Sequence, residues 1–348
     1  MSRLPTWGRV QANADLTITS FRQATRKNLG KLECTHATMT DNPNDGPAEG
    51  IYVRRPGRPF VIDFIPKPIM ETTPREPSYL IVGAGCMGAS TALHLKQQFP
   101  QSNVTLIDRT PFPNPSAAAH DLNKVIRTDY DEIFYMKLAL EAMHAWKTDS
   151  LLSKHYHETG IVWAGPEKMS DGIIKNYKTL GVNNQAEILE PETARTRWGG
   201  ILRDTEWTGL KQVLYNPHAG WGDAEQALRD VIQKAVDLGV KYVAEGALKV
   251  LLHSDGTCVG VQTQTGNIIK ADRTILCTGA NTAQLLADSA PEKPELQVDR
   301  RLVAAAAIMC LYKVPESEVP KYESAPIIIN VLDHTQGKIT RIPGIRPY

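Results

Sequence analysis

The residues best suited to chemistry in this chain form a glycine-rich turn. Residues 83–88, Gly-Ala-Gly-Cys-Met-Gly, match the spacing G-x-G-x-x-G. In such a turn the first glycine permits a tight bend, the second lets a pyrophosphate approach the backbone, and the third lets helix and strand pack closely. The N–H groups at the start of the helix, and the positive end of its dipole, then bind the phosphates. The six residues alone are a weak signal, because an ordinary strand-to-helix turn can contain the same glycines.

The segments around this turn give it the context of a dinucleotide site. The apolar run Tyr79–Val82 precedes it and predicts a buried parallel strand, and residues 89–96 are typical of a helix. Residues 103–107 predict a second strand that ends at Asp108, 20 residues beyond Gly88 (108 − 88). A carboxylate at this position accepts hydrogen bonds from the ribose hydroxyls of an adenosine. The sequence therefore predicts a dinucleotide site and disfavours NADP, but the motif does not distinguish NAD from FAD.

A second group of candidate residues follows Asp108, and these residues distinguish FAD from NAD. Residues 116–127 (SAAAHDLNKVIR) resemble the corresponding segment of the fungal amadoriases (fructosyl amino acid oxidases) and of the sarcosine, saccharopine and pipecolate oxidases. These belong to the D-amino-acid-oxidase-like flavoenzymes. The resemblance covers roughly residues 79–310 and continues through residues 215–222 (YNPHAGWG) and 277–281 (CTGAN). It implies FAD as the cofactor.

The resemblance also implies roles for individual residues. Ser116 would contact the pyrophosphate, while His120, Asn123 and Lys124 would line the isoalloxazine and form the catalytic set. Lys124 would face the flavin and order a water or bind an anionic group near N5. Judged without the family, Lys124 is a solvated lysine and His120 a structural histidine. Arg127 is left outside the catalytic set, because such an arginine is more often an ion-pair partner.

Two positions further along the chain complete the expected cofactor site. Gly279 lies in a Thr-Gly-Ala turn after a predicted strand, where the backbone could approach the cofactor. The alternative interpretation is an ordinary glycine at the end of a strand, without a cofactor contact. Leu248 lies near a family backbone contact to the adenine, although its residue type alone predicts a core position. Trp207 and Trp221 either border the substrate cavity or pack in the core. The expected cofactor-binding residues are Gly83, Gly85, Cys86, Met87, Gly88, Asp108, Arg109, Ser116, Leu248 and Gly279.

The fold implied by the resemblance is α/β. We expect an FAD-binding Rossmann-like domain, doubly wound and of glutathione-reductase type, with an α+β substrate domain built on a mixed sheet. Residues 79–150 and 208–290 are expected to form the discontinuous FAD-binding domain. Residues 151–207 and 291–348 are expected to form an incomplete substrate domain. Residues 1–78 are expected to be a disordered or extended N-terminal extension, because the stretch 54–77 is proline-rich.

Local patterns predict three further elements. Apolar residues recur at helical spacing from Ile133 to Leu152. A second helical pattern over residues 228–236 is terminated by Gly239. Two apolar strands flank the turn at residues 254–257 (SDGT), which predicts a hairpin.

Composition limits the classes of function. The chain has 348 residues and a formal net charge of +1, a balance that speaks against a nucleic-acid surface. No apolar run approaches the ~20 residues that cross a bilayer. Five scattered cysteines without metal-ligand spacing indicate a reducing compartment. We expect a monomer in the cytoplasm or peroxisome. The mitochondrion is the alternative, if the basic residues 1–32 act as a transit peptide.

The implied reaction is the oxidation of a secondary amine or N-alkyl amino acid of the sarcosine, pipecolate, saccharopine or fructosyl amino acid type. FAD accepts hydride equivalents from a C–N-bonded carbon to leave an imine, and O2 reoxidises the cofactor with release of hydrogen peroxide. Two alternatives stay open: a truncated, catalytically impaired FAD-binding remnant, and an NAD-dependent dehydrogenase with the same dinucleotide motif.

The C-terminal part of the chain departs from the family. Relatives place an oxygen-activating lysine on a strand, whereas the comparable stretch Glu295–Leu302 offers arginines. Relatives also continue with a segment that returns to the flavin domain and usually carries a cysteine linked to the flavin. We therefore expect a C-terminally truncated member with non-covalent flavin, in which Cys310 is a buried free thiol.

Overall fold

The structure is a computed structural model that describes residues 76–205, 207–298, 301–305, 313–323 and 325–331, and the backbone of two strands before them. The chain divides into two compact units, Thr17–Pro77 and the remainder. In the smaller unit, β1 (Gly50–Arg54) pairs antiparallel with β2 (Ile62–Pro66). The proline content of residues 54–77 predicted an extended linker and did not predict β2, a short strand that ends at Pro66. The remaining expectations for residues 1–75 lie outside the described residues.

The larger unit contains a four-stranded parallel sheet with a hydrophobic core on each face. Its strands, in the order β11-β4-β3-β15, are all mutually parallel. Apolar runs such as residues 79–82 form these strands because a parallel sheet is buried on both faces. The bounds are β3 (Tyr79–Val82), β4 (Val104–Asp108), β11 (Lys241–Ala244) and β15 (Arg273–Leu276).

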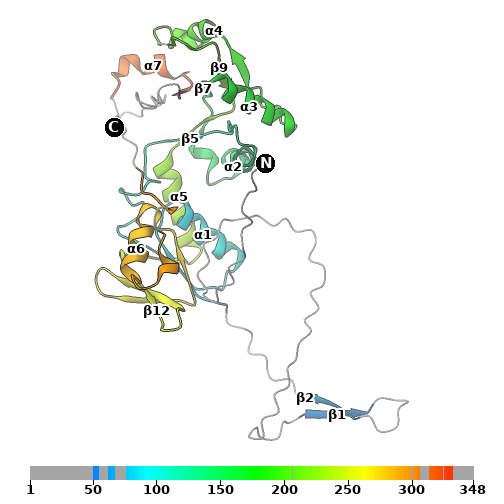
Figure 1. Cartoon of the computed structure of the whole chain (residues 1–348), viewed down its shortest axis with the longest axis vertical. Helices are drawn as coiled ribbons and strands as arrows, with labels where there is room; N and C mark the ends of the chain where they lie inside the picture. The colour runs from blue at the N-terminus through cyan, green and yellow to red at the C-terminus, as the bar shows by residue number, and fades with distance from the viewer. Residues whose placement is uncertain are drawn as a thin grey trace. The chain divides into compact units, whose positions relative to one another are not determined.

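Two helices cover one face of this sheet. They are α1 (Cys86–Gln98) and α5 (Ala224–Asp237), which lie side by side (Figure 1). Their buried side chains pack on Ile81 and Leu106 of the sheet. α5 ends as predicted, because Gly239 adopts the left-handed conformation (φ +96°) that closes a helix C-terminus.

An antiparallel sheet covers the opposite face. It contains β12 (Ala247–Leu252), β13 (Cys258–Thr263) and β14 (Ile268–Lys270). Val261 of β13 packs on Leu80, Val82 and Ile107 of the parallel sheet. The hairpin predicted around residues 254–257 is confirmed by the β12–β13 pairing. Helix α6 (Thr282–Ser289) follows the short helix η3 (Gly279–Asn281) and contacts β12. The layers are helices, parallel sheet and antiparallel sheet, which is the predicted FAD-binding fold class.

A second, mixed sheet has the order β16-β7-β9-β8. β16 is parallel to β7, whereas β9 is antiparallel to β7 and to β8. Helices α2 and α3 cover one face, with Met136 and Tyr177 buried against Trp163. α4 and the short helix η2 lie over the other face with Trp207. The bounds are α2 (Ile133–Thr148), β7 (Ile161–Ala164), α3 (Glu167–Thr179), β8 (Glu187–Leu189), α4 (Pro191–Thr196), η2 (Trp198–Gly200), β9 (Val213–Asn216) and β16 (Ile327–Asn330).

A small antiparallel sheet contains β10 (Gly220–Gly222) between β5 (Lys124–Ile126) and β6 (Tyr156–His157). The short helix η1 (Ser153–His155) precedes β6. The pairing of β9 with β7 and β8 differs from the domain boundary expected at residue 208, since this strand lies in the mixed sheet. By this pairing, the chain stays in the mixed sheet up to Asn216, eight residues beyond the expected boundary (216 − 208). The division into two domains otherwise stays a proposal.

The last described segments are short. They are η4 (Pro294–Leu296), η6 (Glu316–Glu318) and α7 (Val319–Tyr322). The stretch Glu295–Leu302 therefore begins as a helical turn and not as the family's strand, because Pro294 starts that turn. Arg300 and Cys310 lie outside the described residues. Among the described helices, none is long and apolar enough to cross a membrane.

Candidate functional site

The glycine turn joins β3 to α1 in a tightly enclosed bend. Gly83 has a φ of +100°, which a side chain would strain, and a Cβ there would lie 2.4 Å from the carbonyl oxygen of Cys277. A Cβ on Gly88 would lie 1.8 Å from the carbonyl oxygen of Gly83. The Gly83 N–H donates to the carbonyl of Ile107 at 2.8 Å. The first and third glycines are thus required by packing between β4, β15 and α1.

Open space lies beside the second glycine. A Cβ on Gly85 would meet no heavy atom within 4 Å, and the same holds for Gly279. α1 has no acidic residue in its first turn and no side-chain cap, and Cys86 and Met87 are exposed at its start. The first N–H groups of a helix have no intrahelical acceptor, so they can donate to an anion. These residues fit the pyrophosphate of a dinucleotide, and that they bind it stays a prediction.

Asp108 lies at the end of β4 and is 8% exposed. Its Oδ2 accepts a hydrogen bond from the Ala84 N–H at 2.7 Å. Its Oδ1 accepts from the Arg109 N–H at 2.6 Å and from Nδ2 of Asn114 at 2.5 Å. The carboxylate therefore fixes the glycine turn against the loop after β4. A carboxylate accepts about four hydrogen bonds, so these contacts still allow the predicted ribose contact, which stays a prediction.

Arg109 and Ser116 lie in the same loop. Nη2 of Arg109 donates to Oγ of Ser116 at 3.4 Å, and that hydroxyl donates to Oδ1 of Asn114 at 2.9 Å. The Arg109 side chain also lies beside Gly246, where a Cβ would be 2.9 Å from its Cγ. The structure thus brings Asp108, Arg109 and Ser116 together at the carboxyl end of β4, where ligands of α/β sheets bind.

Leu248 does not lie in the core, so the position predicted from its residue type is wrong. Its side chain is 46% exposed. The β12–β13 register passes from Ala247↔Thr263 to Lys249↔Gln262 and leaves Leu248 in a bulge without a partner. A bulge rotates the side chains that follow it, so apolar identity alone gave the wrong face. The expected backbone contact to the adenine stays a prediction.

The predicted catalytic residues lie on one short stretch beside α5. Lys124 begins β5, is 48% exposed, and its Nζ lies 2.6 Å from Oδ2 of Asp121. Nε2 of His120 lies 3.5 Å from Oε2 of Glu225, and the Glu225 N–H donates to the carbonyl of Asp121 at 3.0 Å. Asn123 lies half-buried next to Lys124. These contacts fix the stretch on the start of α5.

The sequence predicts an ion-pair role for Arg127, but its surroundings in the structure are mainly aromatic. Its guanidinium lies over the ring of Tyr130, 3.9 Å from the centroid, and over the ring of Trp163 at 4.6 Å. Nη1 donates to the backbone carbonyl of Asp129. A stacked arginine is oriented in advance for a planar anion. The sequence signal that could have indicated this role is Tyr130, three residues after Arg127.

A buried polar cluster that no sequence pattern predicts follows Arg127. The Asp129 side chain is almost fully buried. Its Oδ1 accepts from Nδ2 of Asn216 at 2.7 Å and from the hydroxyl of Tyr177 at 3.0 Å, while Oδ2 has no hydrogen-bond partner among the described residues. Burial raises the pKa of the Asp129 carboxyl, although Asn216, Tyr177 and Arg127 each lower it.

The raised pKa of Asp129 predicts a pH dependence of stability. A carboxyl whose folded pKa is above its unfolded value contributes fully below the unfolded pKa, about 3.9. That contribution is lost as the pH rises through the folded pKa. The free energy of unfolding of Asp129→Asn, relative to wild type, is therefore expected to increase between pH 4 and pH 8. Urea unfolding at several pH values measures it. Asp171→Asn on α3 is the control and should follow the wild-type curve; parallel curves for all three proteins would contradict the expectation.

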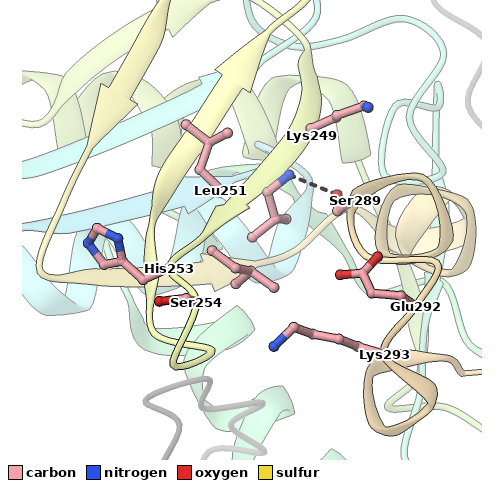
Figure 2. A pocket seen from close by; sticks show the side chains of 9 residues that line it. Lys249, Leu251, His253, Ser254, Ser289, Glu292 and Lys293 are labelled. Carbon is pink, nitrogen blue, oxygen red and sulfur yellow. Dashed lines mark hydrogen bonds between the residues drawn. The ribbon is translucent and has the colours of Figure 1, made fainter.

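A separate pocket of about 430 Å³ lies between β12 and the end of α6. Lys249, Leu251 and His253 line one side, and Glu292 and Lys293 face them (Figure 2). The Val250 N–H donates to Oγ of Ser289 at 2.8 Å, which joins β12 to α6 at this pocket. None of the sequence-predicted site residues lines it.

Comparison with known proteins decides between the cofactors. The family model described as DAO, FAD dependent oxidoreductase, matches residues 78–341. The chain belongs to this family. The cofactor of this family is FAD, so the NAD-dependent dehydrogenase is not favoured.

Individual relatives agree with the family. L-saccharopine oxidase of Schizosaccharomyces pombe is 30% identical over 267 residues, covering 72% of this chain and 59% of that protein. A modified fructosyl peptide oxidase of Aspergillus nidulans is 25% identical with a TM-score of 0.61, covering 74% and 60% of the two chains. Amadoriase II of Aspergillus fumigatus, a fructosamine oxidase, is 28% identical with a TM-score of 0.58, covering 76% and 62%. The chain thus spans about 60% of the length of these relatives.

Proposed function

We propose that this oxidoreductase oxidises a secondary amine or N-alkyl amino acid to an imine, with hydrogen peroxide as the second product. The observation that carries the proposal is the position of two cations at the ends of β5. Lys124 begins this strand and Arg127 directly follows it. The strand comes soon after the FAD-binding loop at Asp108. The names of the relatives support an amine substrate, since they include a saccharopine oxidase and fructosyl peptide oxidases.

FAD supplies the site that accepts hydride equivalents from the carbon next to nitrogen. Arg127 would bind the substrate carboxylate. Its guanidinium is oriented by Tyr130 and Trp163, and one of its N–H groups is used by the carbonyl of Asp129. A guanidinium has about five N–H donors in a rigid fork, so donors are left for both oxygens of a carboxylate. This contact would orient the substrate so that its amine, and not its side chain, lies near the reacting centre.

Lys124 would act on charge near the cofactor. Its ammonium is held by Asp121 but stays about half exposed, so it can also contact a ligand. A fixed positive charge stabilises the negative charge that develops when O2 is reduced. His120 and Asn123 would orient the same stretch beside the cofactor. The substrates that this arrangement suits are sarcosine, pipecolate, saccharopine and fructosyl amino acids, each of which has a carboxylate beside a secondary amine.

The experiment measures peroxide release by the FAD-loaded protein with these four substrates. Peroxide is expected with at least one of them, and Lys124→Met is expected to lower the rate by about 100-fold, as loss of one transition-state charge contact does. Lys249→Met, in the pocket of Figure 2, is the matched control and should leave the rate unchanged. FAD binding without peroxide from any substrate would instead indicate the FAD-binding remnant. An unchanged rate in Lys124→Met would exclude its proposed role.

We also propose that the protein acts as a monomer in the cytoplasm or peroxisome. The support for the compartment is the set of five scattered cysteines, which is typical of a reducing environment. Light scattering of the FAD-loaded protein and imaging of a tagged chain in cells test the two parts of this proposal separately.

A further inference from the structure

The buried carboxyl of Asp129 joins its own segment to two elements of the mixed-sheet region. Asp129 itself lies between β5 and α2. Its Oδ1 accepts hydrogen bonds from Asn216 of β9 and from Tyr177 of α3. The Tyr177 hydroxyl also lies 2.7 Å from Oγ1 of Thr128, the preceding residue. The segment that follows β5 is therefore bound to the core through side chains, on a sheet and on a helix at once.

The backbone of Asp129 holds a different group. Its carbonyl accepts a hydrogen bond from Nη1 of Arg127, whose guanidinium lies over the rings of both Tyr130 and Trp163. One residue is thus fixed to the core through its carboxyl and to Arg127 through its carbonyl. A shift of the Asp129 backbone would move an acceptor of the guanidinium and the tyrosine that stacks on it.

The surroundings of this carboxyl are apolar, so burying it only to fill space would cost free energy. Tyr177, which donates to this carboxyl, belongs to a buried cluster with Met136, Ile161 and Ile173, all of which are apolar. Burying a carboxyl among such side chains costs free energy unless hydrogen bonds compensate. An apolar residue of similar volume would fill the space at less cost, but it could not hold Asn216 and Tyr177 together. The carboxyl therefore contributes position more than stability.

We propose that Asp129 is a positioning residue that fixes the guanidinium of Arg127 in the orientation that binds the substrate carboxylate. Asp129 touches neither substrate nor cofactor in this arrangement. The catalytic consequence rests on the proposed function, whereas the position of Arg127 does not.

The first test measures the position of Arg127 without any substrate. Phenylglyoxal modifies accessible arginines, and peptide mapping of the FAD-loaded protein gives the rate at Arg127. Asp129→Ala is expected to raise this rate at least threefold, and Asp129→Asn, which keeps an acceptor oxygen for Asn216 and Tyr177, should restore a rate near that of wild type. Arg195 is an internal control, because it lies over Trp207 on the other face of the mixed sheet and should not change.

A second variant protects this test against misfolding. Asn216→Ala removes a donor to the Asp129 carboxyl without altering the segment itself, and it should raise the Arg127 rate in the same way. An unchanged rate at Arg127 in the folded variants overturns the proposal. A rise at Arg127 and Arg195 alike would show general loosening and would overturn it as well.

The catalytic test compares the active N-alkyl amino acid with its carboxamide. Asp129→Ala is expected to raise the KM of the carboxylate substrate about tenfold, with a smaller change in kcat and little change for the carboxamide. Arg127→Ala should remove the same preference, and the double variant should add nothing further. Equal losses with both substrates would assign Asp129 to general stability. If wild type releases no peroxide, the proposed function fails while the phenylglyoxal result still decides the position of Arg127.

Discussion

Replacing Gly85 by valine is expected to abolish tight FAD binding without unfolding the chain. A Cβ at this position meets no heavy atom within 4 Å, and the backbone (φ −70°, ψ −174°) is one that any residue can adopt. Valine would instead fill the space in which a pyrophosphate approaches the helix. The Kd for FAD should rise at least 100-fold, which corresponds to about 2.7 kcal/mol. A titration of the FAD-free protein followed by flavin fluorescence measures this change.

Gly172→Val on α3 is the matched control for Gly85→Val. A Cβ on Gly172 would lie 3.5 Å from Cβ of Asp131, an ordinary contact, so a side chain can begin there without a clash. This variant should bind FAD like wild type, and both variants should unfold within a few degrees of it. An unchanged FAD affinity in Gly85→Val would show that the pyrophosphate does not approach this turn. A large loss of stability would show that the space beside Gly85 is needed for packing.

The elements around the glycine turn could be predicted from the sequence because their determinants are local. The run at residues 79–82 is apolar and ends at a glycine that requires a positive φ, so strand and turn are both specified within a few residues. The next strand ends at Asp108, whose carboxylate then bonds back to the turn. The β12–β13 hairpin was predictable for the same reason, since the turn that closes it lies in four consecutive residues.

The small sheet β5-β10-β6 could not be predicted, because its partners are far apart in the chain. Lys124 pairs with Gly222, and Trp221 pairs with both Val125 and His157. No periodicity indicates such pairings, and a strand flanked by glycines has weak intrinsic preference for a sheet. The resemblance placed Lys124 beside the flavin, but only the structure shows that a neighbouring strand holds it. The pairing of β9 with β7 could not be predicted for the same reason, because β7 ends at Ala164 and β9 begins only at Val213.

The buried polar cluster was hidden for another reason. Asp129 is a charged residue in a polar stretch, and such residues are usually exposed. Its burial depends on donors from Asn216 and Tyr177, which are distant in sequence. The surroundings of Arg127 could not be predicted for the same reason, because its stacking on Trp163 is a tertiary contact. Residue type predicted which side chains could do chemistry, while their orientation depended on packing.

Replacing Gly88 by alanine is expected to destabilise the whole FAD-binding fold. A Cβ there would lie 1.8 Å from the Gly83 carbonyl oxygen and 3.2 Å from Cβ of Cys277, so α1 would have to move away from β3 and β15. Backbone atoms cannot rotate out of the way as a flexible side chain can. We expect a loss of about 3 kcal/mol or more, at the upper end of the effects of overpacking. The thermal unfolding midpoint of the FAD-free protein measures it.

Ser90→Ala is the control for Gly88→Ala, because Ser90 is exposed on the same helix. Alanine is the best helix former, so this variant should change the unfolding free energy by no more than about 0.5 kcal/mol. Gly88→Ala and Gly85→Val then separate two roles within one turn: one glycine is needed for the fold and the other for the ligand. A Gly88→Ala protein that unfolds at the wild-type temperature would contradict this division, since it would mean that α1 can move off the sheet at little cost.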